Sequence, residues 1–252
     1  MATVIAFANQ KGGVGKTTFA TQFAYYLQLD QKKKVLFIDM DAQGSASETL
    51  LEGNFYEGMT SEKLFNDEQP ELKIQQTPRD IDLIGSDQSP DGYDVEALPL
   101  PQVLNPKKWL ESKMDEYDYV IIDCPPSLGR RLVGSLFLAD YVICPIKLSG
   151  YAVSGLKNLF SILLQVQTDL NPNLEILGIA VNEYQNNAVQ RKALALVDEA
   201  LPGYILNTKI RSRSPIDDAS NGTPIFEVRN GHRAAEELKA LFEEILTRIA
   251  SQ

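Results

Sequence analysis

The sequence predicts an α/β fold in which one doubly wound, mostly parallel sheet carries helices on both faces. Three observations lead to this prediction. Short apolar runs recur along the chain, segments of helical periodicity lie between them, and a glycine-rich turn joins the first run to the first helix. Continuous apolar runs are typical of parallel strands buried on both faces, and the alternation of strand with helix indicates βαβ units.

The predicted elements follow one another in that alternating order. The predicted strands are residues 3–9, 35–39, 119–123, 141–146 and 174–182. The first helix begins near Gly15, and its Phe19, Phe23 and Leu27 recur every four residues as a core-facing stripe. Further helices are predicted over residues 156–166, 188–200 and 234–250.

Residues 53–106 are less regular than the rest of the chain. They contain several prolines mixed with acidic residues: Pro70, Pro78, Pro90, Pro99, Pro101 and Pro106. A linker would have such a composition, but residues 81–85 (IDLIG) have the pattern of one more strand. We therefore expect an excursion with short helices rather than a boundary, and one domain over residues 1–252.

Composition limits the class of protein. The chain has 252 residues, is 44% hydrophobic and has a formal net charge of −10. Such a chain buries a good core, and its surface is not basic all round. Cys124 and Cys144 lie in apolar runs without CxxC spacing, which favours buried thiols over a disulfide or metal pair. No signal peptide and no membrane helix is expected, so the prediction is a cytoplasmic protein.

The stretch NQKGGVGKTT, residues 9–18, indicates a phosphate-binding loop. The pattern G-x-x-x-x-G-K-[ST] asks for glycine at position 10, where this chain has Gln10, followed by an additional lysine, Lys11. Backbone N–H groups and a helix N-terminus can surround phosphate oxygens here. Lys16 would reach the β- and γ-phosphates and Thr17 would bind Mg²⁺. The predicted nucleotide-binding residues of the loop are Lys11, Gly12, Gly13, Val14, Gly15, Lys16, Thr17 and Thr18.

A dinucleotide site is the competing interpretation of this turn. Asp39 lies roughly 20 residues further on, where a ribose-binding acid would be. However, G-x-G-x-x-G beginning at Gly13 requires glycine at position 18, which is Thr18. The sequence therefore favours a triphosphate.

The loop resembles the deviant Walker A motif of the ParA/MinD superfamily of ATPases. FIDMDAQGS (37–45) resembles the second motif of that family, and YVIIDCPPSLG (119–129) resembles its Walker B strand and second switch. The C-terminal stretch DDASNGTPIFEVRNGHRAAEELKAL is similar to the ParA/Soj branch. The resemblance spans nearly the whole chain and implies a P-loop NTPase of the short ParA type, with no DNA-binding domain ahead of the loop.

The resemblance also implies a mechanism. Two ATP-bound subunits would enclose the nucleotides as a sandwich dimer, and Lys11 of each would contact the phosphates of the other, as an arginine finger does. Gly12 would lie where the two backbones nearly touch. Lys11, Lys16 and Asp41 are the implied catalytic residues, with Asp41 orienting water, while Thr17, Asp39 and Asp123 would hold Mg²⁺. We expect slow hydrolysis, stimulated by a partner.

Recognition of adenine is less complete. The resemblance places Asn182 and Arg211 at the base, but relatives often have Ile-Pro-Arg where this chain has Ile-Arg-Ser-Arg at 210–213. The missing proline puts the second contact in doubt. Lys147 is a further departure from the family pattern, and we expect a solvated lysine there.

Three functions remain open for such an ATPase, and the first is DNA partition. Basic residues outnumber acidic ones between residues 188 and 233, against the trend of the chain. The predicted DNA-binding residues are Arg191, Lys192, Lys209, Arg211, Arg213, Arg229 and Arg233. A ParA-like partition ATPase would bind double-stranded DNA there without sequence preference, so it would be nucleoid-associated, and a ParB-like or other cargo-bound adaptor would stimulate it.

The alternatives are a membrane-cycling ATPase like MinD and a metabolic or iron–sulfur-assembly relative. The first needs a basic amphipathic tail, but the end AAEELKALFEEILTRIASQ is net acidic. Iron–sulfur carriers need paired cysteines at the dimer face. A synthetase would turn over ATP with a small substrate and without DNA.

Overall fold

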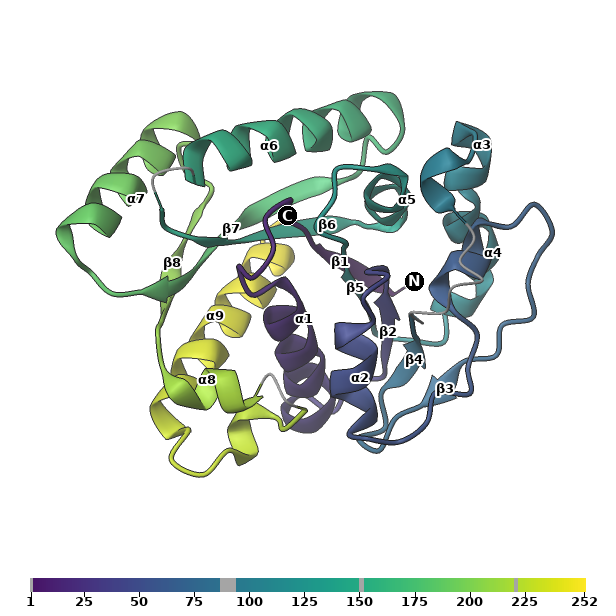
Figure 1. The fold of residues 1–252 in the computed structure, drawn as a ribbon, viewed down its shortest axis with the longest axis horizontal. Helices are drawn as coiled ribbons and strands as arrows, with labels where there is room; N and C mark the ends of the chain where they lie inside the picture. Colours follow the sequence, from purple (N-terminus) through teal and green to yellow (C-terminus); the bar gives the residue numbers. More distant parts are fainter. Residues whose placement is uncertain (1, 87–93, 150–151, 220–221) are drawn as a thin grey trace.

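A single twisted sheet runs through the computed structural model, which describes residues 2–86, 94–149, 152–219 and 222–252 (Figure 1). Within these residues the sheet has eight strands in the order β3-β4-β2-β5-β1-β6-β7-β8. Neighbouring strands are parallel except β3 and β4, which are antiparallel. The predicted doubly wound, mostly parallel α/β fold is confirmed.

The strands match the predicted apolar runs closely. They are β1 Thr3–Phe7, β2 Val35–Asp39, β3 Gln75–Gln76, β4 Asp82–Ile84, β5 Tyr119–Asp123, β6 Tyr141–Lys147, β7 Glu175–Tyr184 and β8 Ile205–Arg211. The strand predicted at 81–85 is β4, so the irregular region contributes to the sheet. Its short antiparallel neighbour β3 has a polar sequence that gives no strand signal.

Helices connect the strands and cover them. They are α1 Lys16–Tyr25, α2 Ser45–Leu51, α3 Leu100–Val103, α4 Asn105–Met114, α5 Arg130–Leu138, α6 Ala152–Asp169, α7 Ala188–Ala200, α8 Ser214–Ala219 and α9 His232–Ala250. The π-helical turn η1 Tyr26–Asp30 extends α1, and the 3₁₀ turns are η2 Ser61–Phe65, η3 Val95–Ala97 and η4 Ile225–Glu227. Pro90, one of the prolines of the irregular region, lies outside the described residues.

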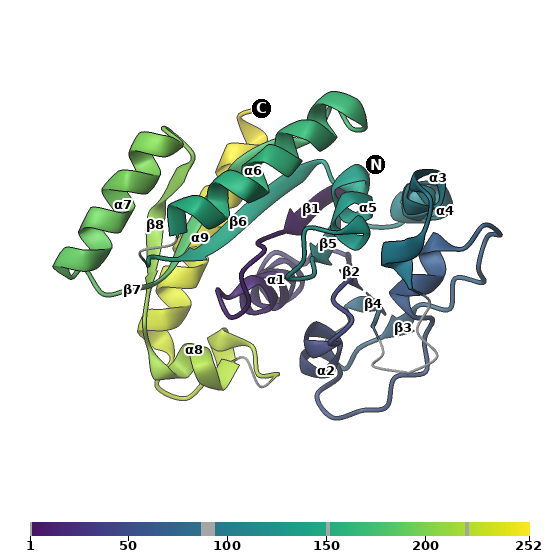
Figure 2. The ribbon, with the colours of Figure 1, turned by 45° about the horizontal axis from the view of Figure 1, so that its top comes forward.

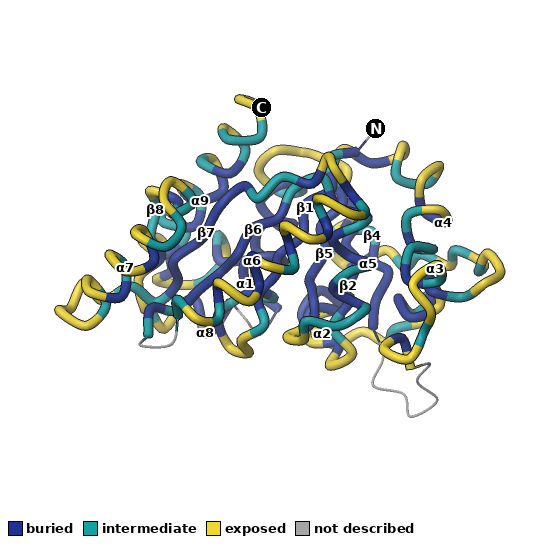
Figure 3. The backbone as a smooth tube through the Cα atoms, turned by 90° about the horizontal axis from the view of Figure 1, so that it is seen from above, coloured by how far each residue is buried: buried dark blue, intermediate teal, exposed yellow. Residues whose placement is uncertain are grey.

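The two faces of the sheet carry separate helix layers (Figure 2). Val4 and Ala6 of β1 pack into a cluster with residues of α3 to α7. Ile5 and Phe7 of the same strand point to the other face, into a cluster with α1, α2, α8 and α9. The strands are accordingly buried between partly exposed helices (Figure 3).

Helix α1 is buried more completely than its predicted stripe requires. Phe19, Phe23 and Leu27 are fully buried, but so is Tyr25 on another side of the helix. The Phe23 ring lies 5.1 Å from that of Phe242 on α9. Helix α1 therefore lies inside the layer of α2, α8 and α9, and the phosphate-loop helix is enclosed on all sides.

Carboxylates of α9 bind the edge strand β8. Glu244 accepts hydrogen bonds from the backbone N–H groups of Asn207 at 2.7 Å and Thr208 at 2.8 Å. Glu237 accepts one from Arg211 at 3.0 Å. Because an open edge strand offers unpaired N–H groups to other chains, these side chains protect the edge as well as fixing α9.

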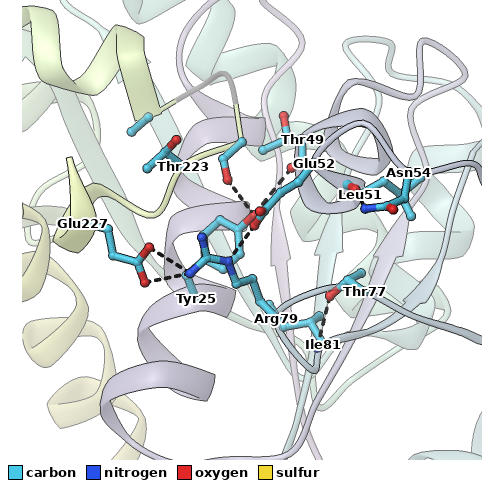
Figure 4. Close-up of polar contacts among 12 residues, drawn as sticks. Tyr25, Thr49, Leu51, Glu52, Asn54, Thr77, Arg79, Ile81, Thr223 and Glu227 are labelled. Carbon is cyan, nitrogen blue, oxygen red and sulfur yellow. Dashed lines mark hydrogen bonds and ion pairs between the residues drawn. The ribbon is translucent and has the colours of Figure 1, made fainter.

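An arginine joins three distant segments on the α1 face of the sheet (Figure 4). Arg79, in the turn between β3 and β4, donates to Glu52 just after α2 at 2.7 Å. It also donates to both carboxylate oxygens of Glu227 in η4, at 2.7 and 2.8 Å. Nearby, the Tyr25 hydroxyl of α1 donates to the Gly222 carbonyl at 3.1 Å. The C-terminal segment is thereby tied to the start of the irregular region.

A search of the helices among the described residues finds none that is long and apolar enough to span a membrane.

Candidate nucleotide-binding site

A cleft of about 440 Å³ opens at the carboxyl ends of the central strands. Open α/β sheets bind ligands at this position. Most of the lining comes from the loop after β1 and the start of α1, from the segment after β2 into α2, and from the ends of β6 and β7, with single residues after β5 and in α8. Its residues are Gly12, Gly13, Gly15, Lys16, Thr17, Thr18, Thr21, Asp41, Gln43, Ser45, Thr49, Pro126, Lys147, Asn182, Glu183 and Ile216. All the predicted loop residues except Lys11 and the buried Val14 are among them.

The loop geometry depends on Gly15. Its φ is +100°, in the left-handed region that favours glycine, and α1 begins at the next residue, Lys16. A Cβ at Gly15 would lie 2.4 Å from Nδ2 of Asn182. The loop therefore has room neither for a side chain nor for ordinary backbone angles at this position.

Asn182 fixes the loop from behind. Its Nδ2 donates to the Val14 carbonyl at 3.0 Å, and its Oδ1 accepts from the backbone N–H of Glu183 at 2.9 Å. Both ends of the amide are thus bound to backbone groups. The base contact that the resemblance implies for Asn182 stays a prediction, and what the geometry gives is support of the phosphate loop.

The predicted metal-binding side chains come together beside the loop. Asp39 and Asp123 are register partners at the ends of β2 and β5. The Thr17 hydroxyl donates to Oδ2 of Asp123 at 2.6 Å, while Oδ1 of Asp123 is buried and has no hydrogen-bond partner among the described residues. Asp39 accepts hydrogen bonds from Asp41 N–H and from the N–H and hydroxyl of Ser47. No sequence motif pointed to the role of Ser47.

The electrostatics of these acids fit a cation. Burial raises the pKa of Asp39 to about 6, against the lowering effect of its hydrogen bonds to Ser47. Burial also raises the pKa of Asp123 well above its usual range, with the charge of Asp39 adding to the effect. A bound dication would stabilise the ionised forms of both carboxylates against burial and mutual repulsion. The Asp123 oxygen that lacks a partner and the Thr17 hydroxyl are the hard oxygen ligands that Mg²⁺ prefers. The residues present therefore fit Mg²⁺.

The two lysines of the loop lie in different surroundings. Lys16 is 6% exposed and lines the cleft. Lys11 is exposed, is not among the lining residues, and its Nζ lies 3.5 Å from Oγ of Ser149 beyond the end of β6. One lysine thus faces its own cleft, and the other reaches along the outer surface of the molecule.

The expectation of a solvated Lys147 is wrong. Its Nζ forms an ion pair with Oε1 of Glu183 at 2.5 Å, and both side chains line the cleft. Lys147 is the register partner of Asn182, so the pair forms across the ends of β6 and β7. Sequence reasoning missed Glu183, because only the register of these strands brings it to Lys147.

Five of the seven predicted DNA-binding residues line two depressions beside β8. Arg191 and Lys209 line a depression of about 510 Å³ between α7 and β8. Arg211, Arg213 and Arg233 line another, of about 470 Å³, between β8 and α9. Lys192 and Arg229 are exposed on α7 and ahead of α9.

Arg211 and Arg213 differ in how exposed their side chains are. Arg213 is bound to Glu237 at 2.7 Å and is only 25% exposed, whereas Arg211 is 69% exposed. Arg211 does not line the nucleotide cleft. Its predicted contact with the base stays a prediction.

The cysteines do not form a metal site. Cys124 and Cys144 are both free and buried, and burial raises the pKa of Cys144 to about 12. Across the described ranges, no group of three or more His, Cys, Asp or Glu side chains could hold a metal by itself. Mg²⁺ characteristically binds through one or two carboxylates together with substrate phosphates, which agrees with this result.

The fold and the cleft define a P-loop nucleotide-binding protein of the α/β class. A family model described as an AAA domain matches residues 2–176. The chain is 31% identical over 252 residues to the sporulation initiation inhibitor protein Soj of Bacillus subtilis, an alignment that covers 97% of this chain and 98% of that protein. The chain therefore belongs to the ParA/Soj family of P-loop ATPases, which confirms the resemblance.

Solved structures agree with this assignment. A putative plasmid partition protein from Borrelia burgdorferi B31, bound to AMPPNP, superposes with a TM-score of 0.79 at 26% identity and covers 100% of this chain and 99% of its own. Cobyrinic acid a,c-diamide synthase from Mycobacterium smegmatis, with bound ADP and magnesium, gives a TM-score of 0.77 at 28% identity, covering 96% and 94%.

Proposed function

We propose that this chain is an Mg²⁺-dependent positioning ATPase that closes into an ATP-sandwich dimer and binds double-stranded DNA in that state. The observation that carries the proposal is the separation of the two loop lysines. Lys16 serves the phosphates of its own cleft, while Lys11 lies outside that cleft, where a second subunit can receive it. We treat residues 1–252 as one ATPase domain, since one sheet links its described segments.

Each loop and carboxylate residue has a separate task in this proposal. The backbone of residues 12–18 and Lys16 bind the phosphates, Thr17 and Asp123 hold Mg²⁺, and Asp39 supports the metal shell from behind. Mg²⁺ neutralises charge on the phosphate oxygens. The solved relatives named above hold AMPPNP, or ADP with magnesium, which supports ATP and Mg²⁺ as the ligands here.

Asp41 is the residue proposed to orient the attacking water. It lines the cleft, and its Oδ1 accepts a hydrogen bond from the Gln43 N–H at 3.1 Å. A carboxylate that orients water without a strongly basic partner gives slow hydrolysis, and a cargo-bound adaptor is proposed to accelerate it. Slow turnover suits a timer of assembly, which is what a positioning ATPase requires.

DNA binding is proposed for the surface around β8. The exposed basic side chains there belong to α7, β8 and the segment leading into α9. Each copy offers few charges, so two copies in the dimer would bind DNA far more tightly than one. In a cell, this would place the ATP-bound protein on the nucleoid within the cytoplasm.

Salt-dependent DNA binding with ATP, with ADP and without nucleotide tests the proposal. We expect binding with ATP alone, and its loss in Lys11→Ala and Lys16→Ala. Lys33→Ala removes an exposed lysine ahead of β2 and is the matched control, expected to behave as wild type. If the protein binds DNA with the same affinity in all three nucleotide conditions, the proposal of ATP-dependent DNA binding is wrong.

Arg211 is the residue with which to test the DNA surface. Arg213 binds Glu237 of α9 at 2.7 Å, so its removal would disturb α9 as well, whereas the exposed Arg211 lies 3.9 Å from the same carboxylate. Arg211→Ala should weaken DNA binding and reduce the salt slope by about 1 per subunit, about 2 for the dimer, while ATP-driven dimers persist. Lys63→Ala, at an exposed position in η2, is the control. Loss of dimers in Arg211→Ala would assign this arginine to folding or to the nucleotide.

A small-molecule synthetase is the second candidate, favoured by the similarity to the diamide synthase. Such an enzyme would hydrolyse ATP only when a carboxylic acid and an amine donor are present, and DNA would have no effect. Measuring ATP turnover with DNA alone therefore separates the two functions.

A further inference from the structure

The ion pair of Lys147 and Glu183 lies at the end of the cleft that the proposed mechanism leaves unassigned. In the sheet, β1 and its phosphate loop stand between β5 on one side and β6 on the other. The metal-binding acids Asp39 and Asp123 end β2 and β5, while Lys147 ends β6 and Glu183 belongs to β7. A nucleotide with its terminal phosphates toward the acids must extend its ribose toward β6 and β7.

Glu183 is held in an unusual backbone conformation. Its φ is +50°, in the left-handed region, although it is not glycine. Its N–H donates to Oδ1 of Asn182 at 2.9 Å, and its carbonyl accepts from Nε2 of Gln190 at 3.1 Å. Residues kept in such a conformation by surrounding bonds are concentrated at ligand sites. The same Asn182 supports the phosphate loop, so the position of Glu183 is fixed relative to the phosphates.

The chemistry of the pair suits a ribose. A ribose offers hydroxyl donors, and a carboxylate accepts several hydrogen bonds at once, so the bond to Lys147 leaves acceptor capacity on Glu183. Carboxylates perform this role in dinucleotide sites. Lys147 fixes the orientation of the carboxylate, and at 40% exposure the Glu183 side chain is accessible from the cleft.

We propose that Glu183, positioned by Lys147, accepts a hydrogen bond from a ribose hydroxyl of the bound nucleotide and so makes the site selective for ribonucleotides over deoxyribonucleotides. This inference rests on the proposed binding of ATP. It gives Lys147 the role of a positioning residue and Glu183 that of a specificity-determining residue.

Competition among ADP, 2′-deoxy-ADP and 3′-deoxy-ADP with Mg²⁺ tests the proposal. Diphosphates are used because closure of the proposed dimer requires ATP and would otherwise add to the affinity. Wild type should bind at least one deoxy analogue roughly tenfold more weakly than ADP, the usual effect of losing a hydrogen bond to a charged group. Glu183→Met has a similar length but no carboxylate, so its ratio of affinities should fall to about one.

The remaining variants separate positioning from stability. Lys147→Met should reduce the discrimination, and Lys147→Arg, which keeps the ion pair, should restore it. Glu116→Met breaks an exposed ion pair with Lys113 on α4, and as a control it should retain the wild-type ratio. Equal binding of ADP and both deoxy analogues by wild type, or unchanged discrimination in Glu183→Met, would overturn the inference. Absence of binding by any adenine nucleotide would instead overturn the proposed function itself.

Discussion

Lys11 and Lys16 belong to the same loop, but Lys11 is exposed and Lys16 is buried. Lys16 is almost completely buried, where an ammonium group is costly unless negative charge lies close to it. Asp123 interacts with this lysine, since Lys16 lowers the pKa of Asp123 against the larger effect of burial. Phosphates would supply negative charge. Lys11 is exposed beside Ser149, and this position agrees with the proposal that it contacts the phosphates of a second subunit.

Gly15→Ala should abolish nucleotide binding. The new Cβ would press on Asn182 at 2.4 Å and displace the amide that supports Val14. The control is Gly203→Ala, because Gly203 also has a positive φ, +82°, but a Cβ there meets no atom of the described residues within 4 Å. The control should lose about 1–2 kcal/mol of unfolding free energy from backbone strain alone and bind nucleotide normally. Calorimetric titration with ADP and thermal unfolding would distinguish the two variants, and normal binding by Gly15→Ala would contradict the geometry of the loop.

At the scale of elements, α9 and β8 depend on each other. Glu244 accepts hydrogen bonds from two backbone N–H groups of β8. Burial alone would raise the pKa of this carboxylate, but these hydrogen bonds outweigh burial. The pKa of Glu244 therefore lies below its usual value. Glu244→Gln retains one acceptor but turns its amide group toward the other N–H. We expect a loss of about 1–3 kcal/mol in urea unfolding at pH 7, and no more than about 0.5 kcal/mol for the exposed neighbour Glu243→Gln.

The same bonds give the stability of this element a dependence on pH. Because folding lowers the pKa of Glu244, its contribution is complete above about pH 4.3, the ordinary value for glutamate, and is lost as pH falls through the lowered value. Wild type should therefore lose more stability than Glu244→Gln between pH 5 and pH 3. Parallel pH profiles of the two proteins would show that the carboxylate does not act in this way.

The elements that sequence analysis predicted well are those whose burial is encoded locally. β2 and β5 are apolar along their whole length, and both ends of each were predicted correctly. β3 is a pair of glutamines whose strand exists only because β4 lies beside it. The complete burial of α1 could not be predicted either. Tyr26 packs against Phe226 of η4 and Phe242 of α9. The Tyr25 hydroxyl donates to the Gly222 carbonyl, so the covering segments follow roughly 200 residues later in the chain.

The candidate site likewise contains residues that the sequence predicted and residues that only the fold brings together. The loop, Asp39, Asp41 and Asp123 could be predicted because short motifs carry them. The bond between Lys147 and Glu183 could not, because it depends on strand register. The attachment of Ser47 to Asp39 likewise requires the turn of chain between β2 and α2. Motifs therefore predicted which groups gather at the cleft, while the contacts that hold those groups in place appeared only in three dimensions.

At the scale of the whole molecule, the site and the proposed DNA surface belong to one connected structure. Arg79 joins the segment after α2 to η4 through carboxylates on both sides (Figure 4). Helix α2 follows the Asp41 segment of the cleft, and η4 precedes Arg229, Arg233 and α9. A displacement of α2 on nucleotide binding would therefore move η4 through Arg79, and with it the basic segment that leads into α9.

Gly12 provides the sharpest test of dimer formation, because its own subunit leaves it free. A Cβ there meets nothing within 4 Å in the described chain, and its φ is not in the left-handed region. Gly12→Val should therefore fold with wild-type stability and still bind ADP, since Lys16, Thr17 and Asp123 are unchanged. If two loops approach each other in the ATP state, however, the added methyl groups must collide with the partner subunit. Light scattering with Mg²⁺ and ATP should then give the mass of a monomer, and DNA binding should be lost with the dimer. A Gly12→Val protein that dimerises as wild type does would mean that the two phosphate loops do not face each other, and the reach of Lys11 into a neighbouring cleft would have to be abandoned.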